Sequence, residues 1–112
     1  MDTAPKFVAV GQALQLGKAQ SKPVLVYFYS SQVPACRRVW DEVINTKSFA
    51  QMTGGSMLSA VESTGPDAQK CHELGVFRVP SLIYIAPDGF HKSTTNIESE
   101  SEVRAFLGSI RS

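Results

Sequence analysis

The sequence predicts one α/β domain with helices on both faces of a central mixed sheet of about four strands. Three observations carry this prediction. The 112 residues match the size of a single domain. Short runs of β-branched and aromatic residues alternate with segments whose apolar residues have helical spacing, and such alternation requires crossovers that place helices on both faces. No internal repeat or linker divides residues 1–112, so we expect the order α-β-α-β-α-β-β-α.

The composition excludes several classes of protein. Hydrophobic residues make up 43% of the chain, which is enough apolar surface to exclude intrinsic disorder. Eleven basic against ten acidic residues leave a net charge of +1, so nucleic-acid binding is not expected. The longest apolar runs, at 24–29 and 82–86, are too short for a bilayer span of about 20 residues. We therefore expect no membrane insertion, and the absence of a secretory signal in the first residues favours the cytoplasm.

The first half of the chain supplies two helices around a strand. Apolar residues spaced i, i+3 and i+7 from Phe7 predict a helix over 7–19, which Ser21 to Pro23 end. The run over 24–29 is typical of a central strand covered on both faces. Apolar residues of helical spacing over 36–44 then predict the second helix: Cys36, Val39, Trp40, Val43 and Ile44. The charged residues between them predict two solvent-exposed i,i+4 pairs, Arg37 with Asp41 and Arg38 with Glu42.

The second half alternates strands and helices to the end of the chain. Turn residues and apolar spacing predict a helical turn over 49–52, a strand over 57–61, a helix over 67–74 closed by Gly75, and strands over 82–85 and 90–95 around a turn at 87–89. Ser99 and Glu102 have the spacing of a capping box that begins the last helix. The buried face of that helix is predicted to hold Val103, Phe106, Leu107 and Ile110.

Two segments of this pattern resemble the thioredoxin superfamily. Residues 24–37 resemble the strand, loop and helix that carry the family's Cys-Gly-Pro-Cys active site. Residues 75–85, followed by Asp88-Gly89, resemble the family's cis-proline loop and the hairpin beyond it. The resemblance covers nearly the whole chain and implies a thioredoxin-like fold with a cis bond between Val79 and Pro80.

Two departures from the family pattern bear on the chemistry. Val33 stands where the family has its first cysteine, and Tyr27 stands where thioredoxins have a buried aspartate that assists proton transfer. Disulfide exchange requires an exposed thiolate, and a valine can neither ionise nor attack. Cys36, in the place of the second cysteine, lies on the apolar stripe, where burial makes a thiol inert. We therefore expect a redox-degenerate member without dithiol activity.

The cysteines leave one alternative open. Cys71 lies on the third helix, which in the thioredoxin arrangement covers the opposite face from the second, so the two cysteines are too far apart for an internal disulfide. The alternative is monothiol thiol–disulfide or peroxide-sensing chemistry at Cys36, a position that peroxiredoxins also use. Against it, Val33 lacks the hydroxyl that peroxiredoxins have there. Neither a metal site nor a cofactor is expected, since His72 and His91 have no further ligands at useful spacing.

The resemblance also implies a binding surface. In the family, the residue before the cis-proline offers its backbone to an extended peptide, and here that residue is Val79. Its neighbours complete the candidate binding residues: Val33, Pro34, Phe77, Val79 and Pro80. An apolar patch there suits a protein or peptide partner, or another domain of a larger chain; alternatively, Val33 and Phe77 complete the local core.

Redox-silent relatives act as interaction modules. The stretch from Trp40 to Glu42 and the Cys71 before the proline loop resemble the thioredoxin-like domain of UBX-domain adaptor proteins. Bacterial domains of the disulfide-interchange type share the Trp40 region and the turn at 87–89 equally well, although they normally keep both cysteines.

Overall fold

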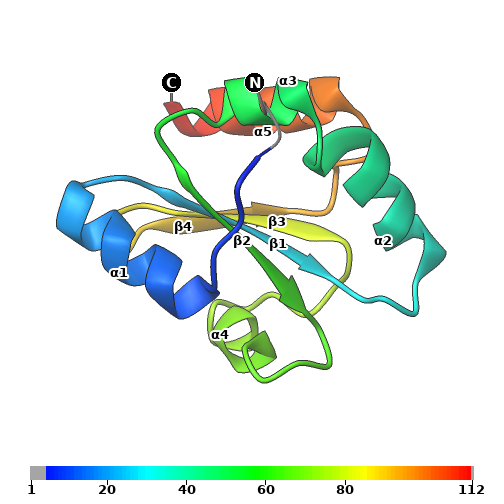
Figure 1. Ribbon diagram of the computed structural model, residues 1–112, viewed down its shortest axis with the longest axis horizontal. Helices are drawn as coiled ribbons and strands as arrows, with labels where there is room; N and C mark the ends of the chain where they lie inside the picture. Colours follow the sequence, from blue (N-terminus) through cyan, green and yellow to red (C-terminus); the bar gives the residue numbers. More distant parts are fainter. Residues whose placement is uncertain (1–4, 112) are drawn as a thin grey trace.

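Four strands form one mixed sheet at the centre of the molecule (Figure 1), as the sequence predicts. The computed structural model describes residues 5–111. The sheet order is β2-β1-β3-β4, in which β1 pairs parallel with β2 and antiparallel with β3, and β4 pairs antiparallel with β3. The strand bounds are β1 Val24–Tyr29, β2 Met57–Glu62, β3 Ser81–Ile85 and β4 His91–Thr94.

Helices cover both faces of the sheet (Figure 1). Their bounds are α1 Val10–Gln20, α2 Pro34–Val39, α3 Lys47–Met52, α4 Ala68–Glu73 and α5 Glu100–Arg111. Helices α1 and α4 pack on one face, and α2, α3 and α5 pack on the other, each with its own buried cluster. Because β1 contributes Leu25 and Tyr27 to one cluster and Val24, Val26 and Phe28 to the other, its continuous apolar run is explained by burial on both faces.

The start of the chain differs from the prediction. Residues 7–9 are not helical: Phe7 forms a parallel bridge with Leu58, and the N–H of Val8 donates to the Leu58 carbonyl oxygen at 2.9 Å. This segment extends the sheet along the outer edge of β2, and the Phe7 ring packs on Trp40 with ring centroids 4.9 Å apart. The predicted i, i+3, i+7 spacing from Phe7 was therefore misleading, because a distant aromatic contact rather than the α1 face determines its position.

Glycine at position 17 is required by the close return of the chain from α1 into β1. A Cβ atom built on Gly17 would lie 2.8 Å from the Lys22 carbonyl oxygen and 2.9 Å from a Val24 methyl group. A Cβ atom at Gly11 would have nothing within 4 Å. The two glycines that interrupt the predicted helix thus differ, and only Gly17 is fixed by packing.

The second helix keeps the predicted buried stripe but not its regular geometry. Cys36, Val39 and Val43 are buried, and α2 continues from Trp40 to Ile44 as a π-helical turn that the spacing did not predict. Of the two predicted charge pairs, Arg37 and Asp41 form one at 3.0 Å. The second is absent from the described residues, because Arg38 instead pairs with Glu98 ahead of α5 at 3.2 Å.

Caps account for most of the remaining differences in bounds. Helix α3 is longer than the predicted turn because the Thr46 hydroxyl accepts the Phe49 N–H at 3.1 Å and starts it at Lys47. At α5 the Ser99 hydroxyl accepts the Glu102 N–H at 3.3 Å, while the Glu102 carboxylate accepts the N–H of Glu98 at 3.1 Å instead of that of Ser99. Within residues 5–111, no helix has both the length and the apolar character needed to cross a bilayer.

Candidate functional site

The β1–α2 loop and the proline loop meet at one end of the sheet. The register of β1 and β3 pairs Phe28 with Ser81, so Val79-Pro80, just before Ser81, lie beside Tyr29-Ser30, just after Phe28. The Val79–Pro80 peptide bond is cis. The two segments singled out from the sequence are therefore neighbours, and residues from both face the solvent at this end of the molecule.

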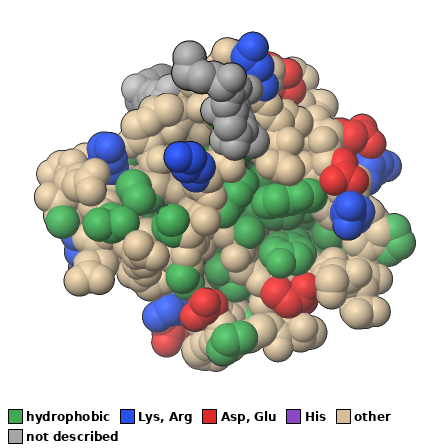
Figure 2. Space-filling view, viewed as in Figure 1, with side chains coloured by type: hydrophobic (Ala, Val, Ile, Leu, Met, Phe, Trp, Pro, Cys, Tyr) green, Lys and Arg blue, Asp and Glu red, His purple; other side chains and the backbone are tan. Residues whose placement is uncertain are grey.

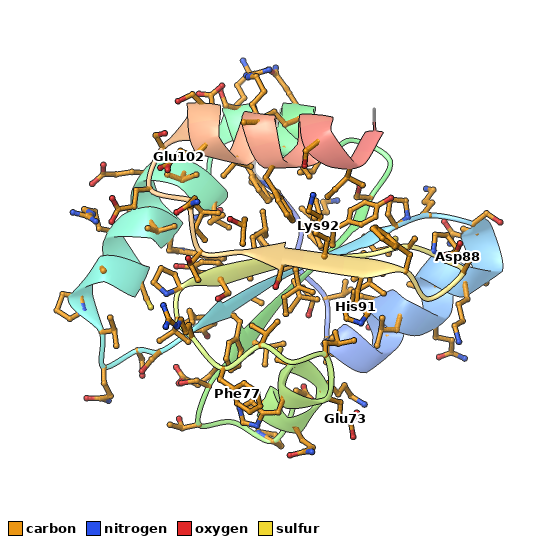
Figure 3. All side chains as sticks on the ribbon, turned by 180° about the vertical axis from the view of Figure 1, so that it is seen from behind. Glu73, Phe77, Asp88, His91, Lys92 and Glu102 are labelled. Carbon is orange, nitrogen blue, oxygen red and sulfur yellow. The ribbon has the colours of Figure 1, made fainter. Side chains whose placement is uncertain are left out.

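The candidate binding residues differ in their exposure. Pro34 is exposed, while Val33, Val79 and Pro80 are half-buried. Phe77 is 68% exposed, which excludes a place for this side chain in the core. It lies beside α4 (Figure 3), where its ring stacks on His72 at 4.9 Å between centroids, and His72 in turn contacts the edge of Phe28. His72 thus supports Phe77 from beneath.

Neither cysteine is accessible. Cys36 is 2% exposed, and its Sγ accepts a hydrogen bond from the N–H of Ser30 at 3.4 Å. Cys71 is buried in the cluster on the opposite face of the sheet, as predicted, and both thiols are free. Burial, with a smaller effect from Asp67, raises the pKa of the Cys71 thiol to about 11. The side chain at position 33, where the helix begins, is an aliphatic one.

Tyr27, which stands where thioredoxins have a buried aspartate, has a structural role. Its hydroxyl donates a hydrogen bond to the backbone carbonyl oxygen of Cys36 at 2.6 Å, so it fastens the first turn of α2 to the sheet. Burial, and then the nearby Cys36 and Tyr29, raise the pKa of this phenol well above its usual value. Tyr27 is therefore a neutral hydrogen-bond donor at every physiological pH and cannot accept a proton from a thiol.

Glu62 holds the other side of the β1–α2 loop, and no local pattern in the sequence indicates this role. Its carboxylate accepts the N–H of Ser31 at 2.8 Å and both the N–H and the hydroxyl of Thr64, at 3.2 and 3.1 Å. Desolvation opposes ionisation of this carboxyl, but the hydrogen bonds outweigh it and lower its pKa. An ionised Glu62 at the end of β2 thus holds the beginning of the β1–α2 loop.

A pocket of about 390 Å³ opens between β2 and α2. We call it the aromatic pocket, and its lining residues are Tyr27, Tyr29, Ser30, Ser31, Cys36, Arg37, Trp40 and Ala60. Figure 2 shows hydrophobic side chains gathered at this place on the surface. This pocket was not predicted from the sequence, although two signals were present: Tyr27 and Tyr29 alternate onto one face of β1, and Cys36 and Trp40 share one face of a helix.

Metal ligands do not gather at this site. Within the described part of the chain, no three histidine, cysteine or acidic side chains lie close enough together to hold a metal ion. His91 lies on the outer strand β4, whereas His72 lies on α4.

Comparison with solved structures identifies the fold. No family model matches the sequence, and no curated protein sequence matches it at a significant level. A thioredoxin from Thermus thermophilus superposes with a TM-score of 0.80 over 95% of this chain and 86% of that chain, at 19% identity. The chain has a thioredoxin-like fold. The DsbH oxidoreductase superposes with a TM-score of 0.78 over 95% of this chain and 84% of that one, at 17% identity.

A third neighbour is the C-terminal domain of DsbD from Neisseria meningitidis in its oxidised form. It superposes with a TM-score of 0.71 over 93% of this chain and 98% of that chain, at 18% identity. At these identities the likeness is one of fold. This chain carries a cis bond before Pro80 and has Val33 at the start of α2.

Proposed function

We propose that this chain is a protein-interaction domain on a thioredoxin-like fold, without dithiol activity. Its binding surface, which we call the loop surface, consists of Val33, Pro34, Phe77, Val79 and Pro80. The partner is a protein or peptide, or another domain of a larger chain. The proposal rests on two facts taken together: Val33, which has no thiol, stands at the helix start, and the thiol of Cys36 is buried.

The missing chemistry is the first support. Attack on a disulfide needs an accessible thiolate, and Cys36 is 2% exposed. Its neighbour Tyr27 is a neutral donor bonded to a backbone carbonyl, so it offers no base. The neighbours in structure include proteins described as an oxidoreductase and a disulphide isomerase. This chain differs from a dithiol enzyme because Val33 and Cys36 supply one thiol between them.

The exposed groups of the loop surface are the second observation that supports the proposal. Phe77 is one of two large hydrophobic side chains that stand exposed in the described residues. Beside it, none of residues 5–111 forms a backbone hydrogen bond with the main chain of Val79. An extended peptide could therefore pair with Val79 while its side chains contact Phe77 and Pro34. The resemblance to UBX-adaptor domains supports the same class of partner.

An insulin-reduction assay tests the missing activity. With dithiothreitol as reductant, we expect the chain to give the same rate as the reductant alone. Val33→Cys restores a thiol at the start of α2, one turn before Cys36, and we expect it to accelerate the reaction. Turnover by the unchanged chain that disappears in Cys36→Ala would contradict the proposal.

A peptide selection tests the loop surface itself. Peptides selected from a displayed library on the unchanged chain are measured again on Phe77→Ser and on Phe90→Ser. Phe90, 54% exposed, is the matched control, since it lies beyond β3 at the opposite end of that strand. We expect Phe77→Ser to abolish binding and Phe90→Ser to preserve it. Equal effects of the two substitutions would contradict the assignment.

Monothiol chemistry at Cys36 is the second candidate, and one contact favours it. The N–H of Ser30 donates to Sγ at 3.4 Å, and Cys36 lines the aromatic pocket. Alkylation by iodoacetamide at pH 7 in a Cys71→Ala background separates the candidates. Labelling of the folded chain as fast as that of the denatured chain would favour monothiol chemistry, and protection of the folded chain would count against it.

A further inference from the structure

The aromatic pocket is separate from the loop surface and has the dimensions of a small-molecule site. Its volume of about 390 Å³ falls within the range of natural ligand pockets, about 300–1,000 Å³. A molecule of one ring and a short side chain, with about ten non-hydrogen atoms, would fill it.

The arrangement of its rings favours a flat ligand. The rings of Tyr27 and Tyr29 lie 5.6 Å apart between centroids and only 9° from parallel. Trp40 lies 5.9 Å from Tyr27 at 27°. The Tyr27 ring is stacked with both others and Phe7 packs on Trp40, so a further planar ring can extend this stack at the half-buried Tyr29. The rings do not form the mutually perpendicular walls that would enclose a compact cation.

The polar end of the pocket offers hydrogen-bond donors. The Ser30 hydroxyl oxygen accepts the N–H of Gln32, which leaves its hydrogen to donate. Arg37 uses its Nε for Asp41, and both terminal amino groups of its guanidinium remain for a ligand. Ser31 contributes a second hydroxyl. These donors and the guanidinium complement a planar anion.

Acidic side chains are absent from the lining. Two acidic side chains lie beside lining residues: Asp41 is bonded to the Nε of Arg37, and Glu62 has its carboxylate oxygens bonded by Ser31, Ser63 and Thr64. Arg37 is therefore the single charged residue among those that line the pocket, and its sign is positive. From the stacked rings and the donors beside them, we propose that this pocket binds a small carboxylate that carries one flat aromatic ring on a short side chain.

Calorimetric titration with 3-phenylpropionate tests the proposal. This probe has about eleven non-hydrogen atoms, and ligand efficiencies for such molecules predict a Kd of about 1 mM. Trp40 is the one tryptophan of the chain, so its fluorescence reports on the pocket directly. We expect the uncharged amide of the probe to bind about tenfold more weakly and 3-phenylpropylamine not to bind. An amine that binds as tightly as the carboxylate would overturn the charge assignment.

Two variants locate the binding. Arg37→Gln should weaken the carboxylate by about five- to tenfold and leave the amide unchanged, because it removes the charged donors alone. Arg38→Gln is the matched control, since Arg38 pairs with Glu98 and does not line the pocket. Ala60→Leu should abolish binding of both probes by filling the space, with an unchanged circular dichroism spectrum showing that it folds. No saturable heat up to about 20 mM, or equal effects of the two arginine substitutions, would overturn the proposal.

Discussion

Replacing Tyr27 by phenylalanine removes one buried hydroxyl from the base of the site. In the structure this hydroxyl donates to the Cys36 carbonyl oxygen at 2.6 Å, and both residues are buried. The substitution keeps the ring, so the volume of the core and the contacts with Trp40 and Tyr29 are retained. It therefore isolates the bond that fastens α2 to the sheet.

The expected loss in the free energy of unfolding depends on whether the Cys36 carbonyl oxygen keeps a hydrogen-bond partner. A buried hydrogen bond between neutral groups contributes about 1 kcal/mol, and an orphaned partner would add to that. Here the Cys36 carbonyl keeps the N–H of Trp40 as a partner, so no further penalty arises. We expect the free energy of unfolding to fall by about 1 kcal/mol, which for a chain of this size lowers Tm by about 4–8 °C.

Urea and thermal unfolding measure this difference. Tyr29→Phe is the matched control, because Tyr29 lies on the same face of β1 and its hydroxyl has no partner among the described residues. We expect that substitution to change the stability by less than about 0.5 kcal/mol. If both variants unfold alike, the hydroxyl of Tyr27 has no special role in holding α2, and the reasoning fails.

Two further predictions concern buried polar groups. The Ser59 hydroxyl is buried in the sheet without a hydrogen-bond partner among the described residues, so Ser59→Ala should raise the free energy of unfolding by about 1 kcal/mol in urea unfolding. Ser81→Ala, which removes a bonded hydroxyl, should lower it. The pKa of Cys71, about 11 when folded against 9.0 ordinarily, means that the unfolded chain loses its proton first. Stability should therefore decline between about pH 9 and 11, and Cys71→Ala should reduce that decline.

Local sequence patterns correctly predicted the helices and strands whose formation depends on interactions within a few consecutive residues. The apolar run over 24–29 became the central strand β1, and the Ser99–Glu102 spacing marked the start of α5. In each case the signal and the structure span only a few residues. The buried position of Cys36 was predictable for the same reason, since the stripe on its helix orients it.

Contacts between distant segments were not predictable in this way. Phe7 lies outside the helix predicted for it because its ring packs on Trp40, 33 positions later along the printed sequence. Glu62 holds the N–H of Ser31, and no spacing in the sequence connects the two. The aromatic pocket depends on both β2 and α2, so it exists only once the sheet has formed.

The two outer edges of the sheet are kept from recruiting strands of other molecules by different means. On the β2 side, the chain's own segment at Phe7 and Val8 occupies the edge at Leu58. On the opposite side, β4 has only four residues, and both His91 and Lys92 on it are exposed. A short edge with a lysine is a poor template for aggregation. Self-association into fibrils is therefore opposed on the β2 side by the chain's own segment at Phe7 and Val8, and on the other side by the short length of β4 and its lysine.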